Sequence, residues 1–90
     1  MNKHEVRDTG QALAYITDCT LATVCDLAGK KSKSKSEYAR QMSIAQTAIN
    51  WGVQMGVDFS KTRAADVLKA GSVVDWAKKF EPKAQASHPL

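Results

Sequence analysis

A run of lysine and serine, Gly29 to Ser36 (GKKSKSKS), divides this 90-residue chain into two parts. Its four lysines cannot be buried in a core, because an unpaired charge is costly to remove from water. Segments with the apolar periodicity of a helix lie on both sides of the run. The run therefore predicts an exposed loop that joins two long antiparallel helices.

The segment before the loop predicts a helix over residues 3–28. Asn2 and Glu5 have the spacing of a capping box, and a later start at Asp8 is the alternative. Gly29 is suited to end the helix. The apolar stripe of this helix is expected to comprise Val6, Leu13, Ile16, Thr20, Val24 and Leu27, with Leu21 and Ala28 at its edge.

The segment after the loop predicts a helix over residues 35–55, opened by a capping box of Ser34 and Glu37 and ended by Gly56. This helix carries two neighbouring apolar stripes: Tyr38, Met42, Ala45, Ile49 and Val53 in one, and Ile44, Ala48, Trp51 and Met55 in the other. Together the stripes cover roughly 200° of arc, about twice the width of an ordinary surface helix. The helix is therefore expected to need more than one packing partner.

The remainder of the chain predicts two short helices over residues 61–70 and 73–80, with Ser60 and Ser72 as their N-caps. Pro82 prevents further extension, and residues 83–90 are interpreted as a flexible tail. We expect an all-α fold with one domain over residues 1–82, in which a C-terminal helical hairpin packs across the two long helices. Trp76 and Phe80 are expected to anchor that hairpin.

Catalysis is not indicated by the residue pattern. The two histidines, His4 and His88, lie near the ends of the chain, where a general base would not be held rigidly. Cys19 and Cys25 are six residues apart and point about 120° away from each other on a helix, which excludes a disulfide between them. We expect free thiols, no enzyme activity, no cofactor and no metal. Free thiols and the lack of an apolar leader or membrane span favour a cytoplasmic location.

Nucleic-acid binding is one functional hypothesis, because the net charge is +4. Residues 62–80 resemble the excisionase-type and small winged-helix pattern, in which an Ala-Ala pair and a leucine precede a glycine-containing turn. An extra residue between Leu68 and Gly71 departs from that pattern, and a hairpin that only closes the bundle is the alternative. The alternative interpretation of the lysine run is a solvated linker. The candidate contacts are Lys30, Lys31, Lys33, Lys35, Arg63, Lys69, Lys78 and Lys79.

Protein–protein interaction is the preferred hypothesis, because the second stripe of the 35–55 helix has no assigned partner. The candidate interface residues are Tyr15, Ile44, Trp51, Met55, Gln46 and Asn50. We expect a non-enzymatic module that forms a homodimer or binds another protein. The alternative is that the C-terminal hairpin covers the second stripe completely. In being short, basic, helical and without catalytic motifs, the chain is similar to accessory proteins of temperate phages and prophages.

Overall fold

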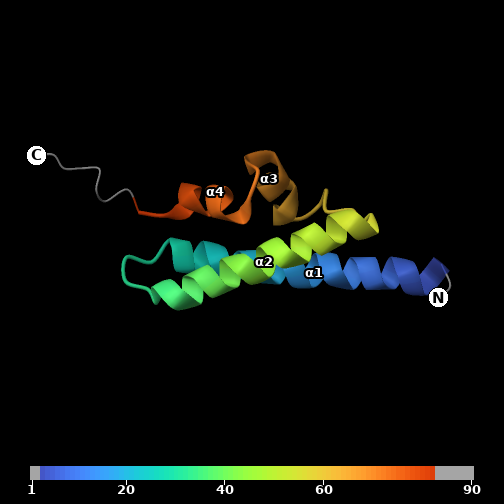
Figure 1. The fold of residues 1–90 in the computed structure, drawn as a ribbon, viewed down its shortest axis with the longest axis horizontal. Helices are drawn as coiled ribbons and strands as arrows, with labels where there is room; N and C mark the ends of the chain where they lie inside the picture. The colour runs from blue at the N-terminus through green and yellow to red at the C-terminus, as the bar shows by residue number, and fades with distance from the viewer. Residues whose placement is uncertain (1–2, 83–90) are drawn as a thin grey trace, which may run out of the picture.

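Two long helices lie side by side in the computed structural model, which describes the backbone of residues 3–82 and the side chains of residues 8–82. The short helices lie along one side of this pair (Figure 1). The elements are α1 (Lys3–Ala28), α2 (Lys35–Met55), α3 (Arg63–Ala70), α4 (Val73–Ala77) and the 3₁₀ turn η1 (Lys78–Phe80). The described residues contain no strand, and the predicted all-α architecture is confirmed.

Some predictions fall on parts of the chain that the structure does not describe. These are the capping box of Asn2 and Glu5, the side chains of His4 and Val6, His88, and the tail over residues 83–90.

Local signals fix both ends of α2. Ser34 accepts a hydrogen bond from the backbone N–H of Glu37 at 3.2 Å, as predicted. The carboxylate of Glu37 does not complete the box, because it accepts hydrogen bonds from Arg40 at 2.7 Å and Gln41 at 2.8 Å. Gly56 ends the helix in the left-handed conformation (φ 78°), which a glycine adopts without steric cost.

The core differs from the prediction along α1. Leu21 and Ala28, placed at the edge of the stripe, are fully buried, whereas Ile16 is 58% exposed. The buried side of α1 includes Thr17, because α3 and α4 pack on that helix in addition to α2. The buried residues of the core are Thr17, Leu21, Val24, Ala28, Tyr38, Ala45, Ile49, Phe59, Ala64, Val67, Val73, Trp76 and Ala77.

The predicted start of α3 was wrong by two residues. The helix begins at Arg63 instead of Lys61, and its N-cap is Thr62, whose hydroxyl accepts a hydrogen bond from the N–H of Ala64 at 3.1 Å. Ser60 belongs to the preceding turn, because its N–H donates to the carboxylate of Asp58 at 2.9 Å.

The final predicted helix is divided in two. Its α-helical part ends at Ala77, and the last turn is the tighter η1. Val73, Trp76 and Ala77 are buried, and the ring of Phe80 meets that of Trp76 edge to face at a centroid distance of 5.0 Å. The anchor is therefore chiefly Trp76, since Phe80 remains 42% exposed.

Two polar contacts hold the C-terminal helices on the long pair. Asp18 of α1 accepts hydrogen bonds from the backbone N–H of Arg63 at 2.9 Å and from its guanidinium at 2.7 Å. Gln46 of α2 accepts the N–H of Val73 at 2.8 Å. Thus α1 positions the start of α3, and α2 positions the start of α4.

Candidate protein-contact face

The α1–α2 pair has one covered side and one uncovered side. Residues three or four apart on a helix share a face, so Asp18, which binds α3, marks the covered flank of α1. Leu13, Ile16 and Thr20 follow each other at spacings of three and four and lie on the opposite flank. On α2, Gln46 marks the side covered by α4. Ile44, Ala48 and Trp51 lie on the other flank. The two uncovered flanks adjoin, since the helices are antiparallel, and we call these six residues the outer face.

The outer face exposes large apolar side chains. Ile16 is 58% exposed, Ile44 47% and Trp51 63%. Leu13, Thr20 and Ala48 are half-buried between them. Single exposed apolar residues are common on protein surfaces, but a contiguous group that includes tryptophan is typical of a contact site.

Charge is missing from this part of the surface. No charged residue occurs between Gln41 and Met55, and Asp18 is the sole one between Thr9 and Cys25. Because Asp18 is bound to Arg63 on the covered side, the six residues of the outer face carry no charge. Arg40, one turn before Ile44 on the same flank of α2, borders the face and is paired with Glu37 at 2.7 Å. Interface centres are depleted of charged residues in the same way, since desolvating a charge is costly.

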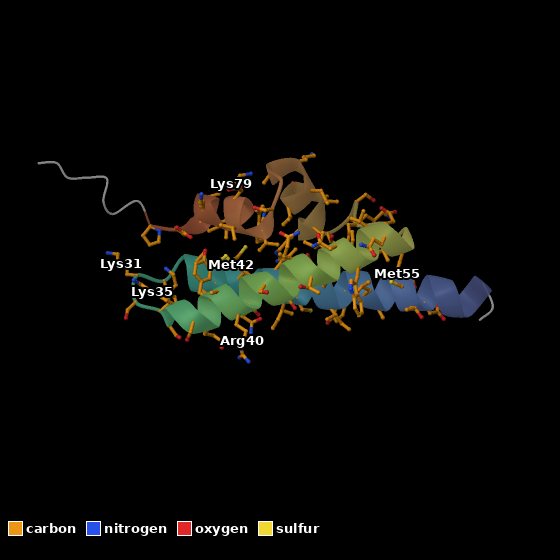
Figure 2. The ribbon with its side chains drawn as sticks, in the orientation of Figure 1. Lys31, Lys35, Arg40, Met42, Met55 and Lys79 are labelled. Atoms are coloured by element: carbon orange, nitrogen blue, oxygen red, sulfur yellow. The ribbon has the colours of Figure 1, made fainter. Side chains whose placement is uncertain are left out.

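The predicted interface residues do not lie together. Ile44 and Trp51 are on the outer face. Tyr15, 71% exposed, instead lines a groove of about 680 Å³ between the N-terminal half of α1 and the segment after α2. Met55, one turn after Trp51 on the same flank of α2, lies at the end of the helix and also lines this groove. Figure 2 labels Met55 near the C-terminal end of α2.

The two predicted amide residues lie on the other flank of α2 from the outer face. The Gln46 amide is used inside the fold, because its oxygen accepts the N–H of Val73 and its nitrogen donates to Asn50 at 3.0 Å. Gln46 and Asn50 therefore belong to the side of α2 that carries α4.

Ile16 and Leu13 were missed as surface residues, because the sequence placed both in the core stripe. A signal for the correct stripe was present: Thr17, Leu21, Val24 and Ala28 also follow helical spacing. Half of this stripe is a threonine and an alanine, whereas Thr20 is the one residue of the predicted stripe that is not a large apolar residue, so hydrophobicity alone ranks the buried stripe lower.

Most of the predicted nucleic-acid contacts are at the loop end of the molecule. Among the basic residues there, Lys33 donates to the carbonyl of Lys30 at 2.9 Å and lies over the ring of Tyr38, and Lys78 pairs with Asp75 at 3.6 Å. Arg63 and Lys69 belong to α3, and Arg63 is held by Asp18. The structure therefore does not present the predicted residues as one helix-turn-helix surface: α4 has five residues, of which three are buried.

The thiols and the ionisable groups offer little chemistry. Both cysteines are free; Cys19 is exposed, and burial raises the pKa of Cys25, which disfavours its reactive thiolate. Hydrogen bonds from Gln41 and Arg40 lower the pKa of Glu37. Within the described part of the chain, no three His, Cys, Asp or Glu side chains are grouped as metal ligands. No helix in that part has both the length and the apolar content to cross a bilayer.

Comparisons with known proteins give no relative. No protein-family model, no curated protein and no solved structure matches the chain.

Proposed function

We propose that this protein is a non-enzymatic interaction module, and that its outer face binds a second copy of the same chain. The observation that carries the proposal is the exposure of Trp51, Ile44 and Ile16 together on a face whose six residues carry no charge. A symmetric dimer requires a patch that is complementary to itself. An uncharged apolar face meets that requirement, because two copies bring no like charges together.

The size of the face argues for a weak dimer. The face spans eight positions of each helix, residues 13–20 and 44–51, which corresponds to a length of roughly 12 Å and, across two adjoining helices, a width of roughly 20 Å. Stable dimers bury about 800 Å² or more of each partner, and smaller contacts are typically transient. Association is therefore expected to depend on protein concentration, with Trp51, the largest side chain of the face, as the dominant contact.

The test is light scattering of the full chain over a wide range of concentrations. We expect the average mass to rise from that of one chain toward that of two. Added sodium chloride should not weaken the association, because apolar burial drives it. A wild-type chain that remains monomeric at every concentration would refute self-association.

A pair of variants locates the contact. Trp51→Glu places a charge in the outer face and should yield a monomer with unchanged helical circular dichroism. Val74→Glu is the matched control, because Val74 is 49% exposed on α4 and lies on the covered side. It should dimerise like the wild type. If Trp51→Glu dimerises equally well, the outer face is not the contact, and if both variants are monomeric, the contact is not specific to it.

A further inference from the structure

The fold brings together two basic segments that are far apart in the sequence. A Cβ atom on Gly29, at the start of the lysine loop, would stand 3.8 Å from the carbonyl oxygen of Phe80 in η1. Tyr38, at the start of α2, donates its hydroxyl hydrogen to Glu81 at 2.8 Å. Figure 2 shows Lys31 and Lys35 at the loop end of the long helices, and Lys79 in the same half of the molecule on the C-terminal short helices, on their side away from α1 and α2. We call Lys30, Lys31, Lys35, Lys79 and Phe80 the basic end.

Of the acids near the basic end, Asp26 in the last turn of α1 is exposed and forms no ion pair with these lysines, and the other three are already engaged. Glu37 accepts hydrogen bonds from Arg40 and Gln41, Asp75 pairs with Lys78, and Glu81 accepts from Tyr38. Within residues 8–82, the four lysines of the basic end have no carboxylate within ion-pair distance. Their ammonium groups are therefore available to an external anion.

An exposed aromatic ring accompanies these lysines. Phe80 follows Lys79 directly, is 42% exposed and contacts the ring of Trp76 edge to face. The sequence of the lysine run contains no aromatic residue, so the combination of ring and charges arises only in the folded chain. Lysines beside an exposed ring are the elements with which proteins bind single-stranded nucleic acid: the cations bind phosphates and a base stacks on the ring.

We propose that the basic end binds single-stranded nucleic acid, with Lys30, Lys31, Lys35 and Lys79 on the phosphates and Phe80 stacked on a base. A duplex fits less well, because its bases are already stacked and the five-residue α4 cannot lie in a groove as a recognition helix. This inference is independent of the proposed dimer, since the outer face and the basic end share no residue.

The magnitude of the salt effect follows from the four lysines. Each phosphate neutralised on a single strand contributes about 0.7 to the slope of log affinity against log salt. Four contacts give a slope of about 2.8, which is a loss of about 50-fold in affinity between 50 and 200 mM salt.

The experiment is fluorescence anisotropy of a labelled 20-nucleotide oligo(dT) titrated with the full chain at several salt concentrations. A duplex of the same length and vesicles containing anionic phosphatidylserine are the comparison ligands. We expect the single strand to bind more tightly than the duplex. No binding to the single strand at 50 mM salt, equal or tighter binding to the duplex, or binding to the vesicles alone would each overturn the proposal.

Matched variants separate a specific site from net charge. Lys31→Gln with Lys79→Gln should lower the salt slope by about 1.4. Lys61→Gln with Lys69→Gln removes the same charge from exposed positions elsewhere and should leave the slope unchanged. Equal effects of the two pairs would refute the site.

A third variant tests the ring. Phe80→Leu should weaken binding at least fivefold without changing the salt slope, and its unchanged thermal unfolding would show that folding is intact. If Phe80→Leu binds like the wild type, stacking is refuted. Should the variant be destabilised, Phe80→Tyr, which keeps a ring, must retain binding for the proposal to stand.

Discussion

Replacing Gly52 by alanine should destabilise the protein, although alanine is normally the better helix former. Gly52 is buried in the interior of α2 and faces the ring of Phe59, which is 3% exposed. A Cβ atom at position 52 would stand 2.5 Å from Cε2 of that ring and closer still to Cζ. Since the ring is enclosed, the added methyl group must displace it from its site.

The expected magnitude combines two opposing effects. Expelling the Phe59 ring from the core forfeits up to about 3 kcal/mol of burial. Alanine in place of glycine returns about 1 kcal/mol through helix propensity. The net loss in the free energy of unfolding should be about 1–2 kcal/mol, which corresponds to a decrease in Tm of roughly 4–16 °C for a chain of this size.

Gly10→Ala provides the control for Gly52→Ala. Gly10 is also interior to a helix, but its Cβ would meet Val57 at 3.6 Å, which is an ordinary contact. This variant should be more stable than the wild type by about 0.5–1 kcal/mol. The same chemical change should therefore have opposite signs at the two sites, as measured by urea unfolding followed by circular dichroism.

A second substitution tests the cause of the Gly52→Ala effect. Phe59→Leu shortens the side chain that the methyl group meets, so the two changes together should cost at least 1 kcal/mol less than the sum of their separate effects. The reasoning is refuted if Gly52→Ala is as stable as the wild type, or if the two substitutions are additive.

Two further substitutions test polar groups. The hydroxyl of Thr17 is fully buried and, among the described residues, has no hydrogen-bond partner, so Thr17→Val should raise the free energy of unfolding by about 1 kcal/mol. The exposed Thr23→Val is the control, and a loss of stability in Thr17→Val would contradict the reasoning. Asp18→Ala should cost about 1–2 kcal/mol in thermal unfolding, because it removes the acceptor of the Arg63 N–H and a partly exposed ion pair. Asp26→Ala, on the same helix, should change stability by less than about 0.5 kcal/mol. Equal losses of stability in Asp18→Ala and Asp26→Ala would contradict this reasoning.

The long helices could be predicted from the sequence because short-range signals define them. The loop lysines, the Ser34 cap and the left-handed Gly56 each act within a few residues of the helix end that they determine. The start of α3 was predicted wrongly because Ser60 and Thr62 are both suitable N-caps. The hydrogen bond from Ser60 to Asp58 places Ser60 in the preceding turn and leaves Thr62 as the cap.

The surfaces could be predicted only in part, because they depend on contacts between distant residues. The expected surplus of apolar surface on α2 is present at Ile44 and Trp51. The exposure of Ile16, by contrast, follows from the packing of α3 and α4 on the other side of α1, with Asp18 and Arg63 45 positions apart. The approach of Phe80 to the lysine loop is equally invisible in the sequence, since no periodicity relates them.

The hydrogen bond from Val73 to Gln46 makes α4 conditional on α2. A helix of five residues does not persist alone in water, and here its first N–H is satisfied by an acceptor from another helix. The backbone amide hydrogens of α4 should therefore exchange with solvent at least as fast as the C-terminal hairpin opens away from α2. Because η1 continues directly from α4, a molecule that clamps the far side of α2 would also lengthen the time for which Phe80 and Lys79 remain in place. Because α2 contributes to both surfaces, we expect binding at the outer face and binding at the basic end to strengthen each other.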